Sequence, residues 1–162
     1  MTELQSTASR IAARLIKRGE TVAVSESAAG GLIAAALLEV PGASRYFLGG
    51  GVVYTAAARE ALLGIGTAGM AGMRSASEPY AQLAARAIRD RLAATWGLAE
   101  TGAAGPTGNR YGDAAGHACL AVSGPTELVR TLETGSSDRP ANMRAFALAA
   151  LALLHEAVTT PR

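Results

Sequence analysis

Apolar and polar residues follow two different periods along the chain, which predicts a mixture of helices and strands. Apolar residues recur at helical spacing in five segments, residues 3–18, 30–40, 56–64, 77–96 and 140–158. Short apolar or β-branched runs predict five strands, at residues 21–25, 46–55, 98–102, 117–124 and 126–135. Gly19 and Pro41-Gly42 stand where two of the helices are expected to end.

The order of these elements predicts an α/β fold. Helices are interspersed with strands, and a Gly-Pro turn at residues 124–125 is typical of a hairpin between the last two strands. We therefore expect a three-layer α/β/α sandwich with a mostly parallel mixed sheet of about five strands. The length of 162 residues fits a single domain that covers residues 1–162.

Composition and charge narrow the class of protein. Hydrophobic residues make up 49% of the chain and charged residues 17%, which allows a folded core and excludes a disordered chain. The net charge is +2, but the arginines are scattered, so we expect no nucleic-acid partner. Cys119 is the only cysteine and is expected to be a buried thiol. The sequence shows no signal peptide, and its longest apolar run is too short and interrupted to span a bilayer, so it predicts a cytoplasmic protein without membrane contact.

The stretch "VAVSESAAGG" is the first candidate for chemistry. It passes from a strand through Glu26 and Ser27 to Gly30 and Gly31, where a helix begins. Free amide groups at such a junction attract anions, and ligands favour the carboxyl ends of strands. A serine here is also a common helix cap, so the stretch alone leaves capping and ligand binding open.

Two further stretches place polar residues after predicted strands. In "TGAAGPTG", Thr101 is followed by Gly102 and Gly105, which would let a ligand approach the backbone, although a plain surface loop has the same composition. In "GGGVVYTAAAR", Tyr54 ends a strand and Arg59 lies about one helical turn later; Tyr54 alone could be a packing residue. Adjacent strands would bring the two glycine-rich loops, after residues 25 and 101, to one edge of the sheet.

Other chemistries are disfavoured. His117 and His155 are the only histidines, and no cysteine or carboxylate follows either at metal-ligand spacing, so no metal site is expected. Nothing local indicates a Ser-His-Asp triad. The glycines near Ser27 lack the spacing and the lysine of a phosphate-binding P-loop.

Several blocks together resemble the CinA C-terminal domain family. They are "SESAAGGLIAAALLEVPGASRYFLGGGVVYT", "ALLG", "SASEPYAQLAARAIRDRL", "TGAAGP" and "SDRPANMRAFALAALALL", and they cover about residues 5–158. The resemblance implies a three-layer α/β/α fold and a homodimer. It also implies nicotinamide-nucleotide amidase activity, in which nicotinamide mononucleotide and water give nicotinate mononucleotide and ammonia without a cofactor.

The resemblance also implies site residues. The positions that match the family's catalytic motifs are Ser27, Tyr54, Arg59 and Thr101. The expected substrate-binding residues are Glu26, Gly30, Gly31, Gly102, Gly105 and Arg139, with Arg144 as the alternative to Arg139.

Two departures from the family pattern bear on activity. Ala28 and Ala29 replace a Cys-Thr pair, and Arg59 stands where the family has a lysine regarded as the base for the serine. Arginine stays protonated and is a poor general base. Lys17, the only lysine, lies outside the motifs. Glu26 is the nearest candidate to replace the base.

Three hypotheses follow from these residues. The first is a weak or altered amidohydrolase that acts on nicotinamide mononucleotide through Ser27. The second is a binding module for a nicotinamide nucleotide or another small phosphorylated amide, without turnover. The third is an amidase for a different small molecule, in which Arg59 recognises an anionic group.

Overall fold

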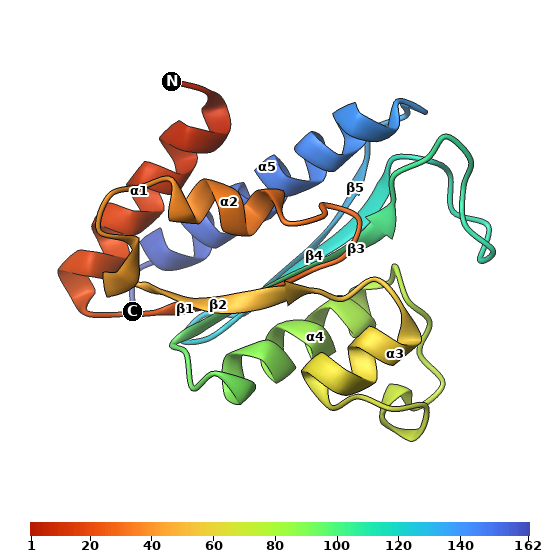
Figure 1. The fold of residues 1–162 in the computed structure, drawn as a ribbon, viewed down its shortest axis with the longest axis horizontal. Helices are drawn as coiled ribbons and strands as arrows, with labels where there is room; N and C mark the ends of the chain where they lie inside the picture. The colour runs from red at the N-terminus through yellow and green to blue at the C-terminus, as the bar shows by residue number, and fades with distance from the viewer.

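The computed structural model describes residues 1–162 and contains a five-stranded sheet between two layers of helices (Figure 1). The helices are α1 (Glu3–Arg18), α2 (Leu32–Leu38), α3 (Ala56–Ala58), α4 (Glu78–Arg91) and α5 (Arg139–Thr159). The strands are β1 (Val22–Glu26), β2 (Phe47–Val52), β3 (Trp96–Ala103), β4 (His117–Ser123) and β5 (Leu128–Glu133). A π-helical turn, Arg59–Leu63, directly follows α3, and 3₁₀ turns lie at Ala43–Arg45 and Ala68–Met70.

The sheet has the strand order β2-β1-β3-β4-β5. β1 is parallel to both β2 and β3, whereas β4 is antiparallel to β3 and forms the predicted hairpin with β5. The carboxyl ends of β1, β2 and β3 therefore lie at the same edge of the sheet. The predicted three-layer fold with a mixed sheet is confirmed, and this edge is where the candidate residues converge.

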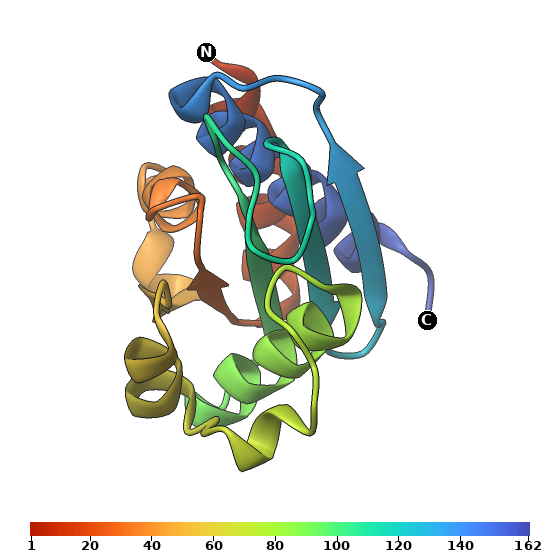
Figure 2. The same cartoon turned by 90° about the vertical axis from the view of Figure 1, so that its right-hand side faces the viewer.

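Helices α1, α2 and α5 cover one face of the sheet, and α3 and α4 cover the other (Figures 1 and 2). Successive side chains of a strand point to opposite faces of the sheet, so each face has its own hydrophobic core. Val24 and Leu98 pack against α1, α2 and α5, whereas Ala23 and Ala99 pack against α4. By length and composition α5 could cross a membrane, contrary to the sequence-based expectation. Half of its most apolar stretch is nevertheless buried within the fold, as in the core helix of a globular domain.

Three predicted helices end earlier than their apolar pattern indicates; of these, the helix predicted over residues 30–40 covers only Leu32–Leu38. The helix predicted to reach Trp96 ends at Arg91, because Ala93 takes a positive φ of 53° and Trp96 already belongs to β3. This reversal lets β3 run directly beneath α4, where a Cβ at Gly97 would lie 2.0 Å from the Ala85 carbonyl oxygen. In the helix predicted over 56–64, only Ala56–Ala58 is α-helical, and the rest is the wider π-helical turn.

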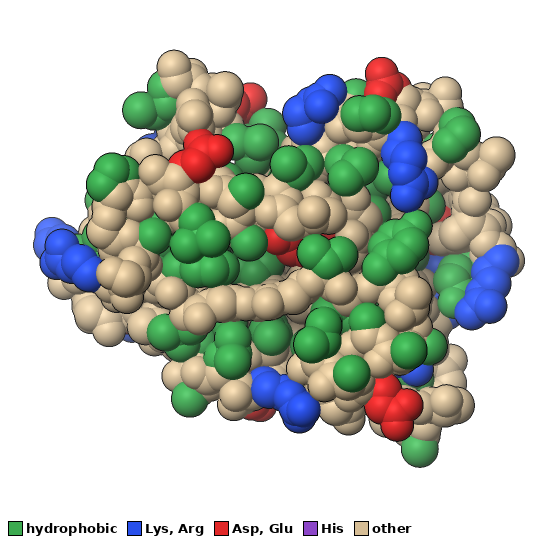
Figure 3. All heavy atoms as spheres, viewed as in Figure 1, with side chains coloured by type: hydrophobic (Ala, Val, Ile, Leu, Met, Phe, Trp, Pro, Cys, Tyr) green, Lys and Arg blue, Asp and Glu red, His purple; other side chains and the backbone are tan.

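The edge strand β2 carries the three glycines that break the expected strand pattern. Gly50 lies against β1 so closely that a Cβ would be 2.1 Å from the Val24 carbonyl oxygen, so a larger residue would separate the strands. Apolar side chains lie above and below this exposed strand (Figure 3). Leu48 and Val52 on β2 are exposed, and the exposed Leu62 lies beside Gly51. The sheet therefore ends in a mostly uncharged edge.

Candidate active site

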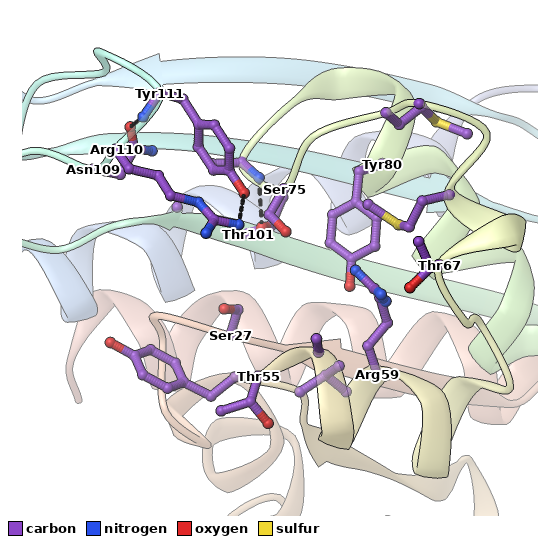
Figure 4. A pocket seen from close by; sticks show the side chains of 18 residues that line it. Ser27, Thr55, Arg59, Thr67, Ser75, Tyr80, Thr101, Asn109, Arg110 and Tyr111 are labelled. Carbon is purple, nitrogen blue, oxygen red and sulfur yellow. Dashed lines mark hydrogen bonds between the residues drawn. The ribbon is translucent and has the colours of Figure 1, made fainter.

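The carboxyl ends of the parallel strands border a cavity of about 550 Å³. Ser27 directly follows β1, Tyr54 follows β2 by two residues, and Thr101 lies near the end of β3. All three line the cavity, and Figure 4 shows Ser27 and Thr101 on facing walls. Its 18 lining residues are Ser27, Val53, Tyr54, Thr55, Ala56, Arg59, Thr67, Met70, Gly72, Met73, Ser75, Ala76, Tyr80, Thr101, Gly102, Asn109, Arg110 and Tyr111.

Ser27 has a hydroxyl that makes no hydrogen bond within the protein, although its backbone is firmly held. The Ser27 amide donates a hydrogen bond of 2.9 Å to Oε1 of Glu100, and its carbonyl accepts one from Gly30. The capping interpretation of Ser27 is wrong, because the first residue of α2 is preceded by Gly31, which offers no side-chain cap. The Ser27 hydroxyl is therefore free to contact a ligand.

The hydroxyl groups of Thr101 and Tyr54 each accept one hydrogen bond from the protein, which leaves their own protons available to a ligand. Thr101 Oγ1 accepts a hydrogen bond of 3.0 Å from the Ala76 amide, and the Tyr54 hydroxyl accepts one of 3.2 Å from Arg139. Both hydroxyl groups can then donate to a carbonyl or phosphate oxygen in the cavity.

Arg59 lies at the other end of the cavity from Ser27. Its Nε donates to the Ile65 carbonyl over 2.9 Å, and its guanidinium group lies beside Tyr80 (Figure 4). Burial raises the pKa of Tyr80, against the opposing effect of the Arg59 charge. Arg59 makes no hydrogen bond to Ser27, because its side chain is directed along the far wall.

Glu26 does not lie in the cavity, contrary to the expectation from the sequence. It ends β1 on the sheet face covered by α2, and its side chain is buried. Its carboxylate accepts hydrogen bonds from the amides of Gly31, Ile33 and Ala34 over 2.9–3.1 Å. Burial raises the pKa of Glu26, and these three amides oppose that rise. Glu26 therefore completes the start of α2 and is not placed to act as the base for Ser27.

The backbone amides of the two glycines after Ser27 already donate hydrogen bonds within the protein. The Gly30 amide donates to the Ser27 carbonyl and the Gly31 amide to Glu26, so neither is free to bind an anion. Gly102 does line the cavity, and it must be small because a Cβ there would lie 2.5 Å from the His117 carbonyl oxygen. Gly105 lies outside the lining, where its carbonyl accepts a hydrogen bond of 2.5 Å from Arg139.

Arg139 joins two predicted parts of the site at the rim of the cavity. One guanidinium nitrogen reaches the Gly105 carbonyl and the other reaches the Tyr54 hydroxyl, although these residues are far apart in the sequence. Arg144, the alternative considered from the sequence, makes no hydrogen bond to either. The structure therefore places Arg139 beside the site, bracing Tyr54, and it does not line the cavity itself.

Arg110 and Tyr111 are cavity residues that the sequence analysis did not identify. They lie in the glycine-rich loop after β3, where Arg110 donates to the Tyr111 hydroxyl over 3.0 Å and lies 5.0 Å from its ring centre. The hydrogen bond from Arg110 lowers the pKa of Tyr111. A basic residue next to an aromatic residue in this loop was a usable signal for a ligand contact.

Asp113 holds this loop against the opposite wall. Its carboxylate forms two hydrogen bonds with Arg74, of 2.7 and 3.1 Å, and accepts a third from Asn109. The hydrogen bond from Arg74 lowers the pKa of Asp113. Asn109 and the residues beside Arg74 line the cavity, so this ion pair fixes two of its walls relative to each other.

His117 supports the same wall from behind. Its two ring nitrogens face two acceptors, Glu133 at 2.5 Å and the Ala76 carbonyl at 2.8 Å, which is satisfied when the ring carries both protons. Burial is the largest single effect and disfavours that charged form, but the hydrogen bonds to Glu133 and Ala76 and the nearby acidic charges together outweigh it, so the pKa of His117 is raised. Of the acidic neighbours of His117, Asp113 precedes it by four residues, whereas Glu133 comes from β5, which the local sequence could not reveal.

Residues 4–158 match the family described as the CinA C-terminal domain. The chain belongs to this family. It is 43% identical over 120 residues to a CinA-like protein from Gloeobacter violaceus, covering 74% of this chain and 28% of that protein. A CinA-like protein from Anaeromyxobacter dehalogenans is 41% identical over 138 residues, covering 84% of this chain and 34% of that protein. The chain thus spans about a third or less of the length of these curated relatives.

Solved structures of CinA proteins have the same fold over nearly the whole chain. The competence/damage inducible protein CihA from Agrobacterium tumefaciens aligns with a TM-score of 0.90 and 30% identity, covering 99% of this chain and 98% of that one. A CinA superfamily protein from Klebsiella pneumoniae aligns with a TM-score of 0.89 and 26% identity, covering 96% and 97%. The predicted family and fold are confirmed.

Within this CinA domain the site combines a free serine with basic, aromatic and hydroxyl groups. Its lining includes Arg59 and Arg110 but no aspartate, glutamate, lysine or histidine. Such a lining favours an anionic ligand, since no negative charge in the wall opposes it. It also lacks a side chain that could take a proton from Ser27 near neutral pH.

Proposed function

We propose that this CinA domain is a slow amidohydrolase for the carboxamide of an anionic pyridine nucleotide, with nicotinamide mononucleotide as the substrate to test. The observation that carries this proposal is the free Ser27 hydroxyl in a cavity with two arginines and no acid in its lining. The cavity volume, about 550 Å³, falls within the usual range for small-molecule sites. The family resemblance supplies the reaction class.

In the proposed reaction, Ser27 Oγ bonds to the carboxamide carbon as the C–N bond breaks. The serine proton leaves with the amide nitrogen as part of ammonia, and water then cleaves the resulting ester to give the carboxylate and restore the serine. Tyr54 and Thr101 donate hydrogen bonds to the carboxamide oxygen, because the amides of Ser27, Ala29 and Gly31 are already engaged by glutamates. Arg59 or Arg110 binds the phosphate.

The rate is expected to be low because the pocket has no general base. Arginine at position 59 remains protonated, and Glu26 is committed to the amides of α2. A well-placed base commonly contributes a factor of about 10²–10⁴ in rate. Proton transfer from Ser27 must therefore pass through water or the substrate itself.

Ammonia release from nicotinamide mononucleotide by purified wild type, Ser27→Ala and Arg59→Lys tests the proposal. We expect slow release by wild type, none by Ser27→Ala, and faster release by Arg59→Lys, since lysine lacks the Nε anchored to Ile65 and can lose its proton. Arg86→Lys is the matched control, because Arg86 lies outside the cavity in a surface ion pair with Glu127. Turnover at the wild-type rate in Ser27→Ala would exclude the assigned role.

A binding module is the second candidate, and the base-free lining favours it. In that case the arginines and hydroxyls hold the nucleotide, and no bond is broken. Calorimetric titration with nicotinamide mononucleotide separates the two functions. Saturable binding together with no ammonia from wild type or Arg59→Lys would assign the site to binding alone, and absence of binding would indicate a different small anionic amide.

A further inference from the structure

Glu100 is an acidic residue in the middle of the central strand β3 and is only 2% exposed. Strand alternation directs Thr101 into the cavity and Glu100 to the opposite face of the sheet, beneath the turn that follows β1. A charged group in a buried apolar strand is unfavourable unless it has partners, so its contacts require an explanation.

One oxygen of Glu100 holds the turn that carries Ser27. Oε1 accepts hydrogen bonds from the Ser27 amide at 2.9 Å and from the Ala29 amide at 2.7 Å. The two amides lie on either side of Ala28, so a single oxygen fixes both ends of the Ser27–Ala29 turn. The other oxygen, Oε2, is buried and has no hydrogen-bond partner.

The surroundings of Glu100 favour its neutral form. Burial raises the pKa of Glu100 to about 7, the amides of Ala29 and Ser27 oppose this rise, and the charge of Glu26 adds to it. Glu26 on β1 is the ionisable group that acts on Glu100. The neighbour of Glu100 on β4 is Leu120, and α2 and α5 contribute apolar side chains such as Ile33 and Phe146 to this face.

We propose that Glu100 is a positioning residue for Ser27, and that gain or loss of one proton on its carboxyl group changes how firmly the Ser27–Ala29 turn is held. This proposal rests on the proposed function insofar as Ser27 is the reactive group. An ionised carboxylate accepts stronger hydrogen bonds from the two amides than a neutral acid does. The partnerless Oε2, in contrast, is tolerated best without charge. The turn is therefore held more tightly on the alkaline side of the transition.

Backbone amide NMR of the whole ¹⁵N-labelled chain tests the proposal independently of activity. We expect the Ser27 and Ala29 amide signals of wild type to shift with a common midpoint near pH 7. Glu100→Gln retains an oxygen acceptor but cannot ionise, so its signals should not titrate there. Glu39→Gln, at an exposed glutamate beyond α2, should retain the wild-type titration. A wild-type titration that is absent, or that persists in Glu100→Gln, would overturn the proposal.

Steady-state deamidation of nicotinamide mononucleotide provides the functional readout. We expect kcat of wild type to rise through pH 7, kcat of Glu100→Gln to be independent of pH there, and KM to stay similar in both. Glu100→Leu, which removes the acceptor, should lower kcat roughly tenfold, because a small displacement of a nucleophile slows attack. An unchanged kcat profile in Glu100→Gln would refute the positioning role. No turnover by wild type would refute the proposed function instead, and the NMR titration would then decide the role of Glu100.

Discussion

Arg110 provides positive charge at the end of the cavity opposite the Arg59 wall, on a loop fixed by the Arg74–Asp113 ion pair. If the ligand is anionic, Arg110→Ala should weaken binding of nicotinamide mononucleotide by about 10- to 150-fold, because a hydrogen bond to a charged group contributes about 1.5–3 kcal/mol. Calorimetric titration measures the dissociation constant, with Arg86→Ala as a control at an exposed arginine outside the cavity. Equal affinity of Arg110→Ala and wild type would place the phosphate elsewhere, with Arg59 as the next residue to test.

Individual site residues were predictable where a sequence motif and a strand end coincide. Ser27 and Tyr54 follow parallel strands and Thr101 lies near the end of one, and parallel strands bring their carboxyl ends together. The prediction that Glu26 lies in the site was wrong, because its side chain points to the face of the sheet opposite the cavity. Glu100 was missed although it is an acid in an apolar strand, because its partners on the turn after β1 depend on strand pairing that the sequence does not specify.

The short helix α2 depends on a carboxylate that precedes it. Its N-cap residue is Gly31, which has no side chain, and Glu26 accepts hydrogen bonds from the amide of Gly31 and from two amides of α2, those of Ile33 and Ala34. Glu26→Ala should lower the free energy of unfolding by about 3–5 kcal/mol, as expected when buried polar groups lose a charged partner. Glu26→Gln keeps an oxygen acceptor and should lose less.

Urea denaturation of these variants measures the change, and amide hydrogen exchange at residues 31–34 localises it to α2. Glu39→Ala is the matched control, since this exposed glutamate at the other end of α2 makes one surface hydrogen bond, to Gln5. Its effect should stay within about 0.5 kcal/mol. An equally small loss in Glu26→Ala would contradict the capping role of Glu26.

The elements themselves were predictable where one face of a helix meets the core. α1, α4 and α5 have apolar residues at helical spacing that are buried in the structure. Their ends were less predictable, because tertiary packing sets them. The residues after Arg91 remain apolar but must reverse direction so that β3 can pack at Gly97, and the turn at Arg59–Leu63 widens although its sequence suits a regular helix.

At the scale of the whole molecule, the buried ionisable groups set how stability depends on pH. Glu26 and Glu100 have raised pKa values, so the folded protein keeps protons that the unfolded chain has already released as the pH rises above about 4.5. The pKa of His117 is also raised, so its contribution is complete below pH 6.5 and is lost as the pH rises through the folded-state value. Asp113 contributes in the opposite direction, because its pKa is lowered in the folded protein and its ionised form therefore stabilises the fold above the unfolded value of 3.8. Stability should therefore be greatest in mildly acidic solution.

Urea unfolding at pH 5 and at pH 8 tests this expectation. The shift of Glu100 from 4.5 to about 7 corresponds to a loss on the order of 3 kcal/mol between these conditions. Glu100→Gln should remove most of the difference, because glutamine cannot ionise and the free-energy cost of burying it is the same at both pH values. His117→Gln should remove a smaller part, since it abolishes the proton shared with Glu133 but leaves Glu100 in place. A wild-type protein equally stable at both pH values would show that Glu100 ionises at its ordinary pKa, and the proton-dependent hold on the Ser27–Ala29 turn would then have no physical basis.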